Sequence, residues 1–250
     1  MHEVKAILLV GGTGTRLRSV LPSKPKVLAP IGEKSFLDLI IHQLRLQGIR
    51  HLVMCTGYLA EQIESRIGDG RIWDVSIEYS KEEEPLGTAG AIKRAHCYLR
   101  NIPEFLVLNG DSFLDINFHD LIAFHRSHAG AVVTMALVPV EDAGRYGTVR
   151  LDASDRITNF AEKTGSHLPG LVNGGVYVFS QAIWQHLPEG PASLENDVLP
   201  RLCEQGVNGQ GVYRQGVYGP GVYGKEQRGM FIDIGTPADY ARAQQLLRSL

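Results

Sequence analysis

The chain is poor in three kinds of feature, and each shortage excludes a class of protein. Its three cysteines lie too far apart for a disulfide framework or a zinc site. It has no basic surplus, since its formal net charge is -2, which argues against a general nucleic-acid-binding protein. No apolar run is long enough to span a bilayer, and no basic leader resembles a signal peptide. We therefore expect a reduced, cytoplasmic protein without nucleic-acid or membrane partners.

Hydrophobic residues make up 44% of the 250 residues, enough to bury the core of one large domain, which we expect to cover 1–250. Short apolar runs alternate with helical patterns along the first 115 residues, and these runs have no polar face. That rhythm is typical of parallel strands covered by helices on both sides. Later runs have shorter connections, which favours an antiparallel or mixed extension of the sheet. The predicted fold is α/β, Rossmann-like and three-layered (α/β/α), with a mixed, mainly parallel central sheet.

Two segments stand outside this pattern. Gly-Val-Tyr recurs at 211, 216 and 221 in a glycine-rich stretch near 205–228. We interpret that stretch as a lengthened surface loop, with an ordered hairpin or a subunit contact as the alternative. His125 and His128 lie three residues apart on an expected helix, where they could pair around a metal. We expect instead a solvated helix face.

A glycine-rich loop, GGTGTR at 11–16, directly follows the first apolar run. Glycines at that place let the backbone turn sharply and direct several N–H groups at one anion. Arg16, Lys24 and Lys26 add positive charge. The loop lacks the Gly-Lys-Ser/Thr ending of a Walker A loop and the third glycine of a dinucleotide fingerprint. We therefore predict a loop that holds a triphosphate.

Seven ordered motifs resemble those of the sugar-1-phosphate nucleotidylyltransferases, also called nucleotide-sugar pyrophosphorylases. The first is the single run GGTGTRL…KPKVLAPI, and the other six are EPLGTAGAI (84–92), VLNGD (107–111), YGTV (146–149), FAEK (160–163), NGGVY (173–177) and FIDIGTP (231–237). Together they cover nearly the whole chain. The resemblance implies a nucleotide-binding half, 1–115, and a sugar-phosphate-binding half, 116–250. It is closest to the branch that transfers guanylyl groups to D-glycero-D-manno-heptose 1-phosphate.

The resemblance also implies roles for individual residues. Catalytic roles fall on Arg16, Lys26 and Asp111. Nucleotide-binding roles fall on Gly11, Gly12, Gly14, Thr15, Leu86, Gly87, Thr88, Asn109 and Gly110. The sugar phosphate would be bound by Gly147, Glu162, Lys163 and Asn173. Magnesium would be held by Asp111 and Asp233, which agrees with the preference of Mg²⁺ for a few carboxylates plus substrate phosphates.

The expected reaction joins an NTP, by preference GTP, to a sugar 1-phosphate and releases pyrophosphate. Attack of one phosphate on another depends on charge neutralisation and alignment more than on acid–base chemistry. Mannose 1-phosphate is the competing acceptor, because one pocket contact discriminates an extra carbon only weakly. A catalytically silent, sugar-nucleotide-binding regulatory subunit is the alternative from another class. The expected partners are small-molecule substrates and a second copy of the chain, with a dimer favoured.

Overall fold

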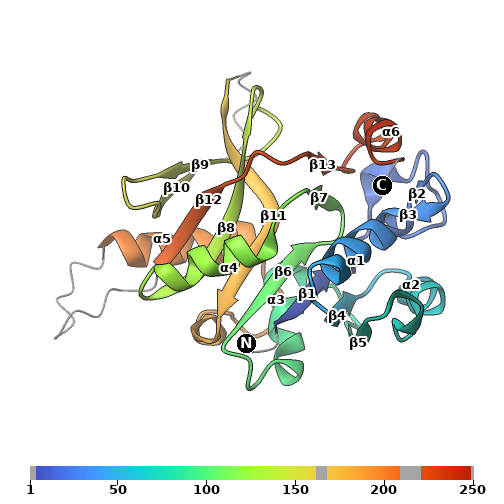
Figure 1. Cartoon of the computed structure of the whole chain (residues 1–250), viewed down its shortest axis with the longest axis horizontal. Coiled ribbons are helices and arrows are strands. Elements are labelled where there is room, and N and C mark those ends of the chain that lie inside the picture. Colours follow the sequence, from blue (N-terminus) through green and yellow to red (C-terminus); the bar gives the residue numbers. More distant parts are fainter. Residues whose placement is uncertain (1–3, 162–167, 209–220, 249–250) are drawn as a thin grey trace.

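The computed structural model describes residues 4–161, 168–208 and 221–248 (Figure 1). A nine-stranded sheet forms its centre, and four parallel strands from the first half lie in the order β6-β1-β4-β5. Their bounds are β1 Lys5–Leu9, β4 His51–Thr56, β5 Ser76–Lys81 and β6 Glu104–Asn109. β1 and β4 are buried along almost their whole length. The parallel arrangement predicted for this half is therefore confirmed.

The second half extends the same sheet through β11 (Gly170–Ser180), which pairs antiparallel with β6. β11 also pairs antiparallel with β8 (Ala131–Val140) and β9 (Thr148–Leu151), and β9 continues to β10 (Ile157–Ala161). β12 (Gly221–Glu226) adds to β8 in parallel. The predicted mixed extension is confirmed.

Helices cover both faces of the sheet, as a three-layer fold requires. Buried side chains of α1, α2, α4 and α6 pack on one face with Ala6 and Leu8, and those of α3 and α5 pack on the other with Ile7. The helices span α1 Phe36–Leu46, α2 Ala60–Ile67, α3 Gly87–Arg94, α4 Phe118–Ser127, α5 Leu199–Asn208 and α6 Pro237–Leu246. The alternating side chains of β1 explain the division, because successive residues of a strand point to opposite faces.

Two small ribbons hold the segments that carry the site. The hairpin of β2 (Pro30–Ile31) and β3 (Lys34–Ser35) follows the short 3₁₀ helix Lys26–Leu28. β7 (Ser112–Leu114) pairs antiparallel with β13 (Phe231–Asp233), which places Asp233 opposite Ser112. Figure 1 shows α6 beside the β2–β3 hairpin, although the two are far apart in the sequence. Chain segments near residues 26, 111 and 233 therefore meet.

The backbone at the amino-terminal end of α3 packs directly against the backbone of a turn in the second half. Gly87 has a φ of +66°, and a Cβ there would lie 2.5 Å from the carbonyl oxygen of Ala192. A Cβ at Gly90 would lie 2.5 Å from the carbonyl oxygen of Gly190. The amide of Ala89 donates to the Ala192 carbonyl at 3.0 Å. Glycine is required at both helix positions because only a backbone without side chains can approach so closely.

Two sequence interpretations need correction. Residues 221–226 are a sheet strand rather than part of a surface loop, because Val222 and Tyr223 are buried against the neighbouring strands. The other two Gly-Val-Tyr repeats, at 211 and 216, lie outside the described residues. The solvated face expected around His125 is also wrong: His125 is 4% exposed, and its Nδ1 lies 2.8 Å from Thr134 Oγ1.

Candidate functional site

The glycine loop lies between β1 and a 3₁₀ turn, Thr15–Leu17. Gly14 adopts a left-handed conformation with a φ of +57°, and a Cβ there would lie 3.0 Å from Lys26 Cβ. A Cβ at Gly11 would lie 3.0 Å from both Glu82 Oε1 and the amide nitrogen of Gly57. Gly12 is surrounded by open space. The loop thus combines two positions that need glycine with one that faces a free volume.

A cavity of about 610 Å³ opens over this loop at the ends of the parallel strands. Most of the predicted nucleotide-binding and catalytic residues line it: Gly11, Gly12, Gly14, Thr15, Arg16, Lys26, Gly87, Thr88, Asn109 and Asp111. Leu86, Gly110 and Lys24 are not in its wall. Gly110 turns toward the core, where its amide donates to the Leu9 carbonyl at 2.9 Å. The structure thus brings ten of these residues around one space.

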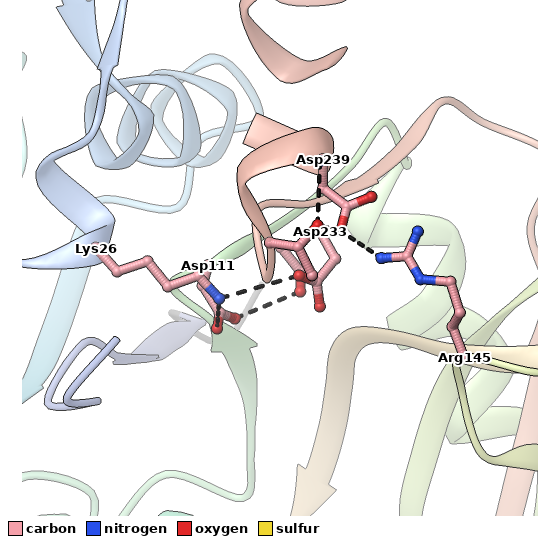
Figure 2. Close-up of polar contacts among 7 residues, drawn as sticks. Lys26, Asp111, Arg145, Asp233 and Asp239 are labelled. Atoms are coloured by element: carbon pink, nitrogen blue, oxygen red, sulfur yellow. Dashed lines mark hydrogen bonds and ion pairs between the residues drawn. The ribbon is translucent and has the colours of Figure 1, made fainter. Parts of the chain in front are cut away.

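A lysine and two aspartates meet at one end of the cavity (Figure 2). Lys26 Nζ donates to Asp111 Oδ2 at 2.7 Å and lies 4.0 Å from Asp233 Oδ1. The Lys26 side chain is 10% exposed. The amide of Ile234 donates to the Asp111 carbonyl at 3.0 Å, which ties the two aspartate segments together. Three charged groups from three distant motifs therefore converge.

The Asp233 carboxylate lacks full compensation for its charge. Burial raises its pKa above the ordinary value and the nearby Asp111 carboxylate raises it further, while Lys26 opposes both effects. Its Oδ1 is buried and has no hydrogen-bond partner among the described residues. An orphaned carboxylate oxygen beside a second carboxylate fits a hard divalent cation that prefers oxygen ligands. Asp111 and Asp233 are thus the residues that could hold a metal ion.

No cluster of three or more metal-binding His, Cys, Asp or Glu side chains occurs in the described part of the chain. A cation between Asp111 and Asp233 would therefore complete its coordination with water and substrate phosphates, as Mg²⁺ commonly does. Asn109, also in the cavity wall, has a buried Oδ1 without a hydrogen-bond partner among the described residues.

Several cavity residues were missed by sequence reasoning. They are Cys55, Gly57, Tyr58 and the acidic run Glu82, Glu83 and Glu84. Cys55 is 3% exposed, and burial raises the pKa of its thiol to about 12, so it is a neutral part of the wall. The signal for the acidic run was its position directly before the PLGTAG motif. All three cysteines are free, in agreement with the sequence analysis.

The predicted sugar-phosphate residues are placed differently. Glu162 and Lys163 lie outside the described residues. Asn173 and Gly147 line neither of the two cavities described here. Asn173 Nδ2 donates to the hydroxyl of the fully buried Tyr177 at 2.5 Å, and Asn173 Oδ1 accepts from the Gly175 amide at 2.9 Å. Asn173 therefore serves as an internal brace of β11.

A carboxylate that no motif indicated links the two halves. Glu195 lies in a turn of π-helix, Leu194–Val198. Its Oε2 accepts from the Thr88 hydroxyl at 2.8 Å, and its Oε1 accepts from the Tyr177 hydroxyl at 3.4 Å. The Thr88 oxygen also accepts from the Leu194 amide at 2.7 Å. The hydroxyl of Thr88 is thus engaged with the second half, although Thr88 lines the cavity.

A second cavity, of about 450 Å³, lies beside Asp233. It is formed by β8, the following loop, β13 and α6, and its wall includes Arg145, Tyr146, Phe231 and Asp239. Tyr146 immediately precedes Gly147, and its ring centroid lies 6.1 Å from that of Phe231. Asp233 therefore stands between the glycine-loop cavity and a space formed by the second half.

Comparison with known proteins identifies the class of this chain. A family profile described as "Nucleotidyl transferase" matches residues 5–249. The chain therefore belongs to the nucleotidyl transferase family. In the part of the chain that the structure describes, no helix has the length and apolar character needed to cross a membrane.

Individual relatives are guanylyltransferases. The chain is 40% identical over 249 residues to a D-glycero-alpha-D-manno-heptose 1-phosphate guanylyltransferase of Aneurinibacillus thermoaerophilus, covering 98% of this chain and 99% of that one. It is 36% identical to a mannose-1-phosphate guanylyltransferase of Mycobacterium tuberculosis, covering 96% of this chain but only 64% of the relative. The fold matches HddC from Yersinia pseudotuberculosis complexed with GMP-PN, with a TM-score of 0.81, 29% identity, and coverage of 98% and 99%.

Proposed function

We propose that the chain transfers a guanylyl group from GTP to D-glycero-D-manno-heptose 1-phosphate, forming a GDP-sugar and pyrophosphate for surface-polysaccharide synthesis in the cytoplasm. The observation that carries the proposal is the convergence of Lys26, Asp111 and Asp233 at one end of the glycine-lined cavity. This arrangement combines a backbone nest for phosphates with fixed charges at the place where one phosphate would attack another. The guanylyltransferase relatives support the nucleotide and the acceptor.

The charges suit an attack of one anion on another. The sugar phosphate and the α-phosphate of GTP repel each other, so the site must neutralise and align them. Lys26 is held by Asp111 and is mostly withdrawn from water, where its charge acts more strongly than at the surface. Arg16 lines the same cavity, where it can contact the phosphates that leave as pyrophosphate. The residues bind and orient, and no covalent intermediate is required.

We propose Mg²⁺ as the cofactor, with Asp111 and Asp233 as its protein ligands. The buried Oδ1 of Asp233, which has no hydrogen-bond partner among the described residues, and its place beside the Asp111 carboxylate support this choice. When bound there, the ion supplies charge neutralisation for the reacting phosphates. Removal of Mg²⁺ with EDTA should abolish pyrophosphate release. Re-addition of Mg²⁺ in excess over EDTA should restore it.

Glu82 supports guanine as the base. Its carboxylate lines the cavity, and its Oε2 accepts from the Leu86 amide at 3.0 Å, which fixes its direction. Burial raises the pKa of Glu82. Guanine carries two adjacent N–H donors that one carboxylate can accept, whereas uracil has one such donor between two carbonyls. Glu82→Gln should therefore reduce the preference for GTP over UTP, and an unchanged ratio of kcat/KM would argue against this role.

The choice of sugar rests on two observations. The heptose enzyme of Aneurinibacillus thermoaerophilus is matched over 99% of its length, whereas the mannose enzyme is matched over 64%. The second cavity, of about 450 Å³, lies beside Asp233, where an acceptor could bind. Mannose 1-phosphate remains the second candidate, since a single carbon is worth only a few kcal/mol of discrimination.

The test is pyrophosphate release by purified protein with Mg²⁺, each of GTP, ATP, CTP and UTP, and a panel of sugar 1-phosphates. Release with GTP and the heptose, at least tenfold faster than with mannose, is the expected result. Equal rates with mannose would widen the acceptor class. A folded protein that binds nucleotide but releases no pyrophosphate with any pair would overturn the proposal in favour of a silent regulatory subunit.

A further inference from the structure

Helix α6 is attached to three segments that each carry a site residue. Its first residue, Pro237, follows Asp233 by four positions, with Ile234, Gly235 and Thr236 between. The Tyr240 hydroxyl donates to the Pro30 carbonyl at 2.8 Å, which joins α6 to the segment that bears Lys26. A Cβ at Gly235 would lie 2.6 Å from Asp233 Oδ1, so the start of the helix is packed directly against the carboxylate.

The third attachment is an ion pair between Arg145 and Asp239 (Figure 2). Arg145 lies two residues before Gly147 in the loop after β8, and its guanidinium donates to Asp239 Oδ2. The same oxygen accepts from the Thr236 hydroxyl at 2.6 Å, while Thr236 Oγ1 accepts from the Asp239 amide at 3.3 Å. Asp239 therefore holds both the first turn of α6 and the loop of the second half.

The pair differs from an ordinary surface ion pair. The Asp239 side chain is only 12% exposed, whereas Arg145 is 52% exposed. Burial opposes ionisation of Asp239, but hydrogen bonds from Arg145 and Thr236 outweigh it and lower its pKa. A buried carboxylate that loses such a partner keeps its desolvation cost, so the first turn of α6 is expected to shift when Arg145 is removed.

We propose that Arg145 and Asp239 are positioning residues whose ion pair fixes Asp233 for metal binding and holds the Tyr146–Gly147 loop beside it. Neither residue lines the glycine-loop cavity. The pair acts through the rigid path Asp239, Thr236, Gly235 and Asp233, which is only seven residues long. This inference rests on the proposed function, because it takes Asp233 as a ligand of the divalent cation.

The test is a titration of the protein with Mn²⁺ in the presence of GTP and without sugar phosphate, followed by electron paramagnetic resonance. Arg145→Gln and Asp239→Asn should each weaken Mn²⁺ binding about tenfold, as expected for partners that orient metal ligands. The double variant should be no weaker than the single ones, because both break one interaction. Arg145→Lys should recover part of the affinity. Asp239→Asn keeps an oxygen for Thr236 and is therefore expected to fold.

Arg50→Gln is the matched control, since Arg50 and Asp74 form an exposed pair at 3.3 Å far from the site. It should leave Mn²⁺ affinity and melting temperature unchanged.

Three outcomes would overturn the positioning role. They are Mn²⁺ affinities within twofold of wild type for Arg145→Gln and Asp239→Asn, additive losses in the double variant, and a parallel loss of metal-free GTP binding. Asp233→Asn separates the two proposals: if it too binds Mn²⁺ normally, both the metal site and the positioning role fail. If the variants lose Mn²⁺ affinity as expected but the wild-type protein releases no pyrophosphate, the proposed function is overturned and the positioning role stands.

Discussion

The two halves of the molecule build their parts of the site in different ways. In the first half the backbone forms the site. Gly11 and Gly14 follow a buried parallel strand and lie where a side chain would collide or would strain the chain. In the second half the site is held by side chains that join distant segments, such as Arg145 with Asp239 and Glu195 with Thr88.

The difference shows how each half can fail. A backbone-built site is sensitive to any added side chain, because its geometry depends on glycine. A site built from side-chain ties is sensitive to the loss of one hydrogen-bonding partner, which leaves another polar group buried without compensation. Substitutions chosen from each half should therefore separate into two kinds of effect.

Asp111→Asn should have the largest effect, because Asp111 stands where the two halves meet. Removal of its charge leaves the cation one carboxylate and leaves Lys26 paired with Asp233 at 4.0 Å instead of with Asp111 at 2.7 Å. Turnover is expected to fall about 10²–10³-fold, the usual loss for a group that stabilises transition-state charge. Pyrophosphate release measures the effect, and thermal unfolding should be unchanged. Activity near that of wild type would place the metal elsewhere; Asp74→Asn, in an exposed pair, is the control.

His125 tests the second half through pH. Burial lowers the pKa of His125 to about 4 from 6.5, so the unfolded chain binds its proton more readily than the folded protein. The contribution of the neutral His125 ring to the unfolding free energy is complete above pH 6.5 and is lost as the pH falls toward 4. Between pH 7 and pH 5 the unfolding free energy should drop by about 2 kcal/mol from this group. Urea unfolding should show a shallower pH slope for His125→Gln, and an equal slope would contradict burial of a neutral ring.

Gly14→Ala and Gly12→Ala test the first half as a matched pair. Alanine at 14 must adopt a φ of +57° and approach Lys26 Cβ to 3.0 Å, whereas alanine at 12 meets open space. Gly14→Ala should lower the unfolding free energy by about 1–2 kcal/mol and raise the KM for GTP. Gly12→Ala should change stability by less than about 0.5 kcal/mol. Equal destabilisation by both would refute a backbone requirement specific to Gly14.

Tyr177→Phe should have the smallest effect. It removes the acceptor of Asn173 and one donor to Glu195, at a cost of about 1 kcal/mol in unfolding free energy. If this network supports the acceptor side, the KM for the sugar phosphate should rise more than the KM for GTP. Tyr98→Phe is the control, because its hydroxyl donates to the Tyr79 carbonyl outside both cavities. Equal changes in the two KM values would show that Tyr177 does not specifically support binding of the sugar phosphate.

The sequence predicted most of the fold, and ten of the residues that it singled out line one cavity. β1, β4 and β6 could be read because their central residues are buried on both faces and therefore appear as apolar runs. The glycine loop, Lys26 and Asp111 could be placed together because carboxyl ends of parallel strands share one edge of a sheet. Asp233 was indicated by the family resemblance of the FIDIGTP motif, whose first three residues form β13.

The rest depends on contacts that a sequence does not display. Arg145 and Asp239 are separated by 94 residues, and Thr88 and Glu195 by 107, so their meeting follows from strand order and from the packing of α6 and the π-helical turn. His125 was misread because a polar residue on a helix looks solvated unless its partner, Thr134 on β8, is known. β12 was misread because its glycines resemble those of a loop, although Gly224 allows close packing against Leu137.

The glycine contact between α3 and the 190–192 turn limits how new substrate preferences could be engineered. Gly87 and Gly90 touch the carbonyls of Ala192 and Gly190 at distances that admit no further atom. Both positions are close to the cavity, but a mutant library that varies them would consist mostly of misfolded proteins. Diversity is better directed at Tyr146 and Phe231, whose side chains line the second cavity and can change size without moving the backbone.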